Sequence, residues 1–284
     1  MSFLGNFRLI RFLVPSLLLL IAGVGIAHAV MQTTAEQLEQ HSLNNMFNGA
    51  EQMHFAVSWS GGIKIGDLFI SIVPVEPGTD RFAIKVRVTD YGLFKLVYPV
   101  DDTFTTIVEG PLKLPLQYAV HQREGWGRET WGRETKRLTI YDQQKLEVTY
   151  QKNAQPQKKY PIAGTVYNEF SAFFISRALT FEQLDTPIRV PAFVDKQRHE
   201  VAVKAVGREV RNSLFGEVAT LKIQPKMTFK GLYDKDGDTV FWVTDDECRV
   251  PIEIHSKIVV GSLVAELEEY NNSRCTPPSH RNTP

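Results

Sequence analysis

The sequence predicts a mainly β protein in which curved antiparallel sheets form a half-barrel-like wall around one central apolar helix. Short runs of alternating apolar and polar residues, separated by Gly, Pro, Asp and Asn, recur from His54 to Tyr270, which is typical of a meandering antiparallel sheet. One helical pattern, over 168–179, interrupts these runs. The hydrophobic fraction of 43%, with 11% aromatic residues, is ordinary for a chain that folds around a core.

Residues 1–29 have the three parts of a secretory signal peptide. Two arginines precede an apolar run over 12–26, and Ala27 and Ala29 supply the small residues of a cleavage site. The apolar run is shorter than the ~20 residues that a membrane-spanning helix needs. We therefore expect export, cleavage after Ala29 and a mature protein that does not span the membrane. The competing interpretation is an uncleaved anchor.

The remaining chain divides into a leader, one β-rich region and a tail. Residues 30–50 are polar and are predicted to be a loose helix or an unstructured leader. The β-rich domain is expected over 51–270, as two similar-sized halves, 51–167 and 180–270, that the helix joins. Residues 271–284 are polar and rich in proline, so we expect a loose tail.

Several strands of the first half have specific signals. Apolar residues over 82–88 alternate with arginine and lysine, which predicts a strand with one buried and one solvated face. The alternation changes phase near Gly66, which predicts a β-bulge there. Residues 142–144 are predicted to form a hairpin turn.

The helix over 168–179 carries apolar side chains, including Phe170 and Phe174, around most of its circumference, so we expect it to be largely enclosed. Asn168 is suited to cap its N-terminus. Arg177 lies on this apolar helix and needs a carboxylate or carbonyl partner if it is enclosed. A structural role is favoured for Arg177 over a ligand site.

Charge and motifs exclude several classes of function. The chain has 32 basic and 32 acidic residues, and loss of the two arginines in 1–29 leaves a net charge of 30 − 32 = −2. This balance lacks the positive field on which nucleic-acid binding depends, so we expect no nucleic-acid partner. The sequence has no nucleophile motif, P-loop, dinucleotide fingerprint or zinc-ligand spacing, so we predict neither an enzyme nor a cofactor.

The segment Asp234–Asp238 resembles part of a calcium loop. Thr239 stands where that loop has its glycine, and Asp245 stands where it has a glutamate. An Asp-Gly hairpin turn is the favoured interpretation, and no metal site is predicted.

The only two cysteines, Cys248 and Cys275, both lie in the exported part of the chain. An oxidising compartment favours a disulfide between them. Two separate thiols are the alternative.

A five-residue duplication, WGRET over 126–130 and again over 131–135, is the most distinctive local feature. Tryptophan and arginine dominate binding hot spots, so Trp126, Arg128, Trp131 and Arg133 are candidate partner-binding residues. The alternative is an elongated hairpin with no binding role.

Three segments carry a resemblance to a known family: FAVSWSGGI over 55–63, SAFFISR over 171–177 and FWVTD over 241–245. The chain resembles the bacterial exported family called domain of unknown function 3108. The resemblance implies a periplasmic protein of Gram-negative type with no established activity. The family's usual Asp before the helix is Asn168 here, which argues for a capping role at this position. The expected architecture is also similar to that of LolA- and LolB-type lipoprotein carriers, which hold acyl chains.

The leading functional hypothesis is a non-enzymatic envelope protein that binds a lipid-like or other apolar ligand inside the half-barrel. The candidate ligand-binding residues are Trp59, Phe82, Phe170, Phe174 and Trp242. The alternative is an interaction or assembly module with a packed interior, which binds envelope partners through strand edges and the 126–135 hairpin. An open apolar interior favours the first hypothesis and a filled one the second.

Overall fold

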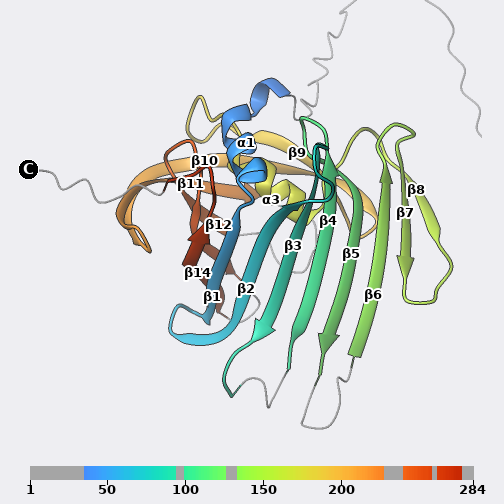
Figure 1. The fold of residues 1–284 in the computed structure, drawn as a ribbon, viewed down its shortest axis with the longest axis horizontal. Helices are drawn as coiled ribbons and strands as arrows, with labels where there is room; N and C mark the ends of the chain where they lie inside the picture. Colours follow the sequence, from blue (N-terminus) through green and yellow to red (C-terminus); the bar gives the residue numbers. More distant parts are fainter. Residues whose placement is uncertain (1–34, 94–98, 126–132, 227–238, 258–260, 277–284) are drawn as a thin grey trace, which may run out of the picture. The chain divides into compact units, whose positions relative to one another are not determined.

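The computed structural model describes residues 35–93, 99–125, 133–226, 239–257 and 261–276, which belong to one compact unit (Figure 1). The predicted signal peptide and the Asp234–Asp238 segment lie outside the described residues. Trp126, Arg128 and Trp131 lie outside them as well.

One antiparallel sheet of 14 strands contains every strand of the described part of the chain. The strands are β1 (Gln52–Trp59), β2 (Ile63–Pro74), β3 (Arg81–Asp90), β4 (Asp101–Glu109), β5 (Leu114–Glu124), β6 (Arg133–Asp142), β7 (Glu147–Lys152), β8 (Lys158–Pro161), β9 (Ile188–Val194), β10 (Gln197–Ser213), β11 (Gly216–Lys226), β12 (Thr239–Thr244), β13 (Pro251–Lys257) and β14 (Ser262–Asn271). Neighbours in sequence are neighbours in the sheet, except that β8 and β9 are its two edges and β1 pairs with β14. The mainly β, antiparallel expectation is confirmed, and the two halves of the chain are two parts of one sheet.

The sheet is curved but not closed by hydrogen bonds, since its two edges are β8 and β9. Aromatic rings bring these edges together: the ring centroids of Tyr160 in β8 and Phe193 in β9 lie 6.1 Å apart. Tyr167 covers the outer edge of β9, because its N–H donates to the Pro191 carbonyl at 2.8 Å and its carbonyl accepts from the Phe193 N–H at 2.8 Å. The result is a barrel-like sheet with an aromatic seam.

Two local predictions in β2 and β3 agree with the structure. Phe82, Ile84 and Val86 are buried, while the charged residues between them are exposed. The β1–β2 register shifts beside Gly66, where a bulge was expected. A Cβ on Gly66 would stand 2.4 Å from the Thr89 carbonyl oxygen, so a glycine lets the β2 and β3 backbones approach closely there.

Helix α3 (Glu169–Arg177) has the predicted start. The Asn168 side chain accepts from the Ser171 N–H, and the Ser171 hydroxyl accepts from the Asn168 N–H, which completes a capping box. The Asn168 amide also donates to the Thr106 hydroxyl of β4 at 2.7 Å, which ties the helix to the sheet. In Figure 1, α3 lies between the front strands, β3 and β4, and the strands behind, β9 to β11.

The expectation of one central apolar helix needs correction. The described interior contains a second helix, α1 (Gln40–Asn48), which follows the short 3-10 turn Ala35–Gln37. Moreover, the buried side of α3 includes Ser171, Ser176 and Arg177, so the helix is enclosed without being uniformly apolar. Burial of Ser171 and Arg177 is tolerated because both side chains have hydrogen-bond partners within the chain.

Helix α1 occupies part of the segment that we expected to be a loose helix or an unstructured leader. Leu43, Met46 and Phe47 are buried, with exposed fractions of 2%, 0% and 1%. Their i, i+3, i+4 spacing forms one apolar stripe, which explains why this short, otherwise polar helix packs into the core. The Leu38–Leu179 β-bridge ties its start to the end of α3.

Arg177 makes the partnership that its burial requires. Its guanidinium donates to both carboxylate oxygens of Glu51, at 2.7 and 2.8 Å, and its Nε donates to the Arg249 carbonyl at 3.0 Å. Both charged side chains are 0% exposed. The Tyr270 hydroxyl donates to Glu51 at 3.2 Å. This bidentate pair joins α3, the start of β1 and the turn before β13.

Arg177→Met should therefore reduce the free energy of unfolding by about 3–5 kcal/mol, because it leaves the Glu51 carboxylate buried without its cation. Urea unfolding followed by circular dichroism measures this loss. Arg81→Met is the matched control, since Arg81 and Glu109 form an exposed pair and its loss should cost under about 1 kcal/mol. Equal stabilities of the two variants would contradict the structural role of the buried pair.

Cys248 and Cys275 lie at disulfide distance, with their Cα atoms 5.7 Å apart. Residues before Cys275 hold α1 in place: the Asn272 amide donates to the Asn45 carbonyl at 3.1 Å, and the Ser273 N–H donates to the Gly49 carbonyl at 2.9 Å. The described start of the expected loose tail is thus packed against α1.

Non-reducing peptide mapping should recover a peptide pair linked through Cys248 and Cys275. Reduction should lower the free energy of unfolding by roughly 3–4 kcal/mol, because the closed loop restricts the unfolded chain. A Cys248→Ser/Cys275→Ser double variant, which should not respond to reductant, is the control. Complete alkylation of both thiols without prior reduction would show that the bond does not form.

Candidate functional site

The inner face of the sheet, which faces α3, becomes more exposed with distance from α1. In β3, Phe82, Ile84 and Val86 are 4%, 0% and 2% exposed, whereas Val88, the next inward residue, is half-buried. Cross-strand partners share one face of a sheet, so the register identifies the inward residues of the neighbouring strands.

The same gradient runs through the neighbouring strands. In β1, Phe55 is 0% exposed and Val57 is half-buried; in β2, Ile70 is 4% exposed and Leu68 is half-buried. Phe104 in β4 and Ile254 in β13 are also half-buried inward positions. We call Val57, Leu68, Val88, Phe104, Phe173 and Ile254 the inner apolar face.

Helix α3 contributes Phe173 to this face, and all of the residues of the face except Val88 pack against the main core. Phe173 of α3 is half-buried and its ring centroid lies 5.2 Å from that of the inward residue Phe241. Phe170 lies 5.2 Å from Phe104 and 6.1 Å from Tyr118. Both helical rings therefore cover the sheet only partly, and apolar side chains in the interior remain accessible.

The five predicted ligand-binding residues fall into different environments. Phe82 and Phe174 are buried core residues, and both pack against Phe47, at centroid distances of 5.4 and 5.7 Å. Of the five, Phe170 alone is a half-buried residue of the interior. Phe82 and Phe174 thus support the core beside the inner apolar face.

The placement of Trp242 in the interior is wrong. Its neighbours Phe241 and Val243 point into the main core, so Trp242 points to the outer face, where it packs with Val218 and Ile252. The Arg211 guanidinium lies 4.2 Å and the Lys222 ammonium 5.0 Å from its ring centroid. This tryptophan is a covered element of the outer surface.

Trp59 follows Val57 on the inward side of β1 and lies at the exposed end of the strand. It stands at the β1–β2 hairpin opposite Ile63, and the two side chains are 42% and 62% exposed. The hairpin end protrudes beyond the last inward contact of β1, which explains the exposure.

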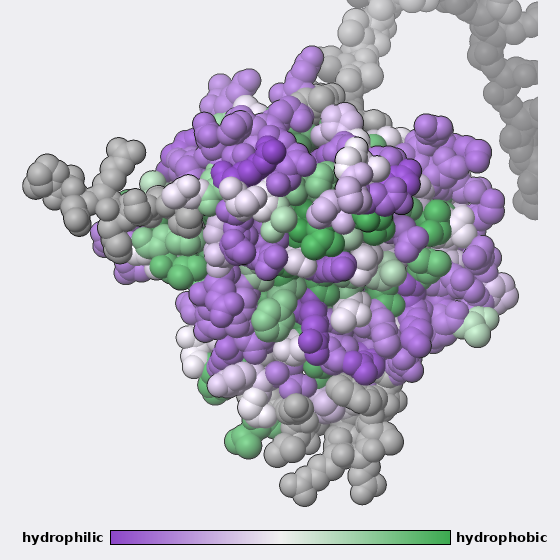
Figure 2. Space-filling model, in the orientation of Figure 1, coloured by the Kyte–Doolittle hydropathy of each residue, from purple (hydrophilic) through white to green (hydrophobic). Residues whose placement is uncertain are grey.

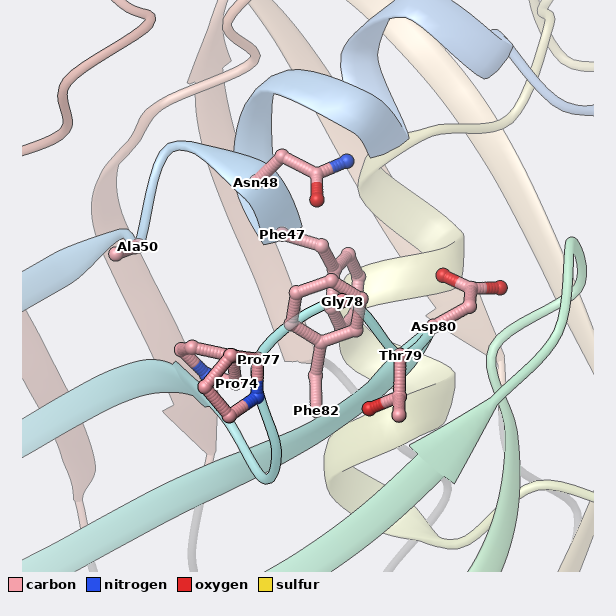
Figure 3. Close-up of a pocket in the computed structure, with 9 residues that line it drawn as sticks. All are labelled: Phe47, Asn48, Ala50, Pro74, Pro77, Gly78, Thr79, Asp80 and Phe82. Carbon is pink, nitrogen blue, oxygen red and sulfur yellow. The ribbon is translucent and has the colours of Figure 1, made fainter.

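A crevice of about 500 Å³ opens at the other end of the molecule, between α1 and the β2–β3 hairpin (Figure 3). Phe47 and Phe82 face each other at its base, and Pro74, Pro77 and Asp80 line its sides. Figure 2 shows hydrophobic residues across the middle of this face, below α1, between mostly hydrophilic regions. Because both rings at the base are buried, the crevice ends at the core and does not continue to the inner apolar face.

A polar network borders the inner apolar face on β4, β5 and β6. Asp102 is 5% exposed and accepts from the Gln122 amide at 2.9 Å and from the Arg123 N–H at 2.9 Å. Desolvation nevertheless raises the pKa of Asp102. Gln122 in turn accepts from Arg137 at 2.9 Å.

Glu169 lies close to this network. Part of the residue reaches solvent, but its carboxyl accepts from the Tyr118 hydroxyl at 2.9 Å, and desolvation there raises the pKa of Glu169. Burial, with Glu169 nearby, also raises the pKa of the Tyr118 hydroxyl. The inner side of β1 to β3 is therefore apolar, whereas β4 to β6 carry Asp102, Gln122 and Arg137 beside buried residues such as Tyr118 and Val120.

One cluster of potential metal ligands lies on the outer face. Atoms of His54, Asp67 and Glu268 lie within 4.8 Å of one another. The Lys64 ammonium already pairs with Asp67 at 2.9 Å and with Glu268 at 3.3 Å. Burial acts to raise the pKa of Asp67, but hydrogen bonds from Lys64 and His54 bring it below its ordinary value. The carboxylates of this cluster therefore already have partners within the chain, in Lys64 and His54.

The proposed partner surface at residues 126–133 is almost entirely outside the described chain. Its flanking strands β5 and β6 pair with each other, and Glu124 lies opposite Arg133 at the end of this pairing.

Asp245, the last position of the calcium-loop comparison, pairs with Arg208 at 2.8 Å and Arg249 at 3.3 Å. Within the described ranges, no helix has both the length and the apolar character needed to cross a bilayer.

These features define the class: an open, barrel-like antiparallel β protein with two helices in the described part of its interior. The family described as "Protein of unknown function (DUF3108)" matches residues 54–268, and the chain belongs to this family. A solved structure entitled "Crystal Structure of Beta-barrel-like Protein of Domain of Unknown Function DUF1849 from Brucella abortus" is similar, with a TM-score of 0.54 and 6% identity over 80% of this chain and 98% of that one. At this identity the likeness concerns the fold alone. No curated protein matches the chain.

Proposed function

We propose that the protein is an exported, non-enzymatic envelope protein that binds a lipid-like or other apolar ligand against the inner apolar face. The observation that carries this proposal is the exposure gradient, in which inward apolar residues change from fully to half-buried on adjacent strands. Exposed apolar area in a concave interior gains free energy when a ligand covers it, at about 25 cal/mol per Å².

The alternative hypothesis is an interaction or assembly module, and the packed half of the interior supports it in part. However, a module that needs only a packed core has no use for accessible apolar residues beneath α3. The strand edges are also poorly suited to pairing with a partner, because β8 is short and carries lysines and a proline, and Tyr167 covers β9. The inner apolar face therefore favours the ligand hypothesis.

Leu68→Glu should weaken binding of the neutral fluorescent probe N-phenyl-1-naphthylamine by roughly tenfold or more, because it puts a carboxylate on the apolar face. Phe69→Glu is the matched control: Phe69 is the adjacent residue, points to the outer face and is 40% exposed. Circular dichroism checks that both variants fold. If intact protein binds no apolar probe, and lipid extracts of the purified protein contain no stoichiometric ligand, the proposed function fails.

Export is tested separately. N-terminal sequencing of the periplasmic fraction should give Val30 as the first residue, because Ala27 and Ala29 occupy the small-residue positions of the cleavage site. An Ala29→Arg variant, which blocks those positions, should accumulate uncleaved. Recovery of the wild-type protein in the inner membrane with Met1 or its neighbour at the N-terminus would show that residues 1–29 are an anchor.

A further inference from the structure

Two cations stand directly opposite each other on the inner side of the sheet. Arg137 in β6 pairs in register with Lys152 in β7, and its other cross-strand neighbour is the inward residue Val120. Both cations are half-buried. Like charges directly opposite on adjacent strands repel each other, and partial burial increases the cost.

The neighbourhood supplies little compensation. Among the described residues, no carboxylate forms a salt bridge with Arg137 or Lys152, and the Arg137 Nε is buried without a hydrogen-bond partner. The hydrogen bond from Arg137 goes to the neutral Gln122. The nearby Glu169 carboxyl accepts from the Tyr118 hydroxyl and attracts Arg137 without forming a salt bridge with it.

The outward cations of the same strands behave differently. Lys136, one residue before Arg137, pairs with Glu134 at 3.1 Å, and Lys159 of β8 pairs with Glu147 at 2.8 Å. In the described part of the chain, salt bridges therefore form on the solvated face, where pairing contributes least, and none forms with the two inward cations. This pattern is the one expected where an external anion completes the site.

The cations lie at the end of a row that crosses the inner side of the sheet and includes Phe104 of the inner apolar face. Across the sheet, Val86 pairs with Phe104, Phe104 with Val120, Val120 with Arg137, and Arg137 with Lys152. Val86 and Val120 are buried, so Phe104 is the accessible apolar residue of this row, and with strands ~4.8 Å apart β4 and β6 are separated by roughly 10 Å. This span suits a molecule with a hydrocarbon tail and one polar end.

We propose that Arg137 and Lys152 bind the anionic head group, carboxylate or phosphate, of an amphiphile whose tail covers the inner apolar face. This inference rests on the proposed function and names its ligand class. A guanidinium and an ammonium together match a small oxyanion, because charge-assisted hydrogen bonds from both reach its oxygens. Binding also relieves the repulsion between the two cations.

The test compares the anionic fluorescent fatty acid cis-parinarate with neutral N-phenyl-1-naphthylamine. Arg137→Gln/Lys152→Gln should weaken parinarate binding on the order of tenfold or more and leave the neutral probe within about twofold. Lys136→Gln/Lys159→Gln is the control, since it removes the same charge from the outer face and should change neither. Inorganic phosphate alone, measured by calorimetry, should bind far more weakly than parinarate.

Three results overturn the inference. Equal parinarate affinity in wild type and the inward double variant shows that the cations bind no head group, while retained binding of the neutral probe leaves the proposed function intact. Phosphate binding as tight as parinarate binding shows an anion site that does not use the tail. If wild type binds neither probe, both the inference and the proposed function fail.

Discussion

The buried ion pair between Arg177 and Glu51 is the constraint on which the rest of the structure depends. Removing both charges from water is costly, and only good geometry with full hydrogen bonding offsets that cost. Here the guanidinium is bidentate, its Nε reaches the Arg249 carbonyl, and Tyr270 donates to the carboxylate. The bidentate geometry determines how the two side chains lie relative to each other, so the pair fixes the C-terminal end of α3 against the start of β1. With Asn168 bonded to Thr106 at the other end, α3 is held at both termini.

Because α3 is held in this way, it divides the interior into two regions of different character. On one side α1 completes the core with Leu43, Met46 and Phe47, and the segment that ends at Cys275 clamps α1 through Asn272 and Ser273. On the other side the inward residues of β1, β2 and β3 become half-buried within one or two pleats beyond the core, at Val57, Leu68 and Val88. The stability of the packed first region offsets the cost of leaving apolar side chains exposed in the second.

Features that depend on local chemistry could be predicted from the sequence, and features that depend on register could not. The alternation in β3, the bulge beside Gly66, the Asn168 cap and the need of Arg177 for a partner all follow from residues close in sequence. Trp242 was misplaced because Phe241, Trp242 and Val243 are all apolar. Without alternation of polar and apolar residues, the sequence does not show which of the three point inward and which point outward. The stripe of Leu43, Met46 and Phe47 was a usable signal for α1 that its polar surroundings concealed. Arg137 and Lys152 meet only through the β6–β7 register, which no local pattern encodes.

The seam between β8 and β9 bears on how such an interior can admit a ligand. In a closed barrel, widening the wall breaks a ladder of backbone hydrogen bonds. Here the edges meet through Tyr160, Tyr141 and Phe193, whose ring contacts are worth about 0.5–1.5 kcal/mol each beyond their buried area. Within the described residues no ladder of backbone hydrogen bonds joins these two edges, whereas every other pair of neighbouring strands has one. Arg137 and Lys152 lie on β6 and β7, beside this seam, so the polar part of the interior is next to the place where no strand ladder closes the wall.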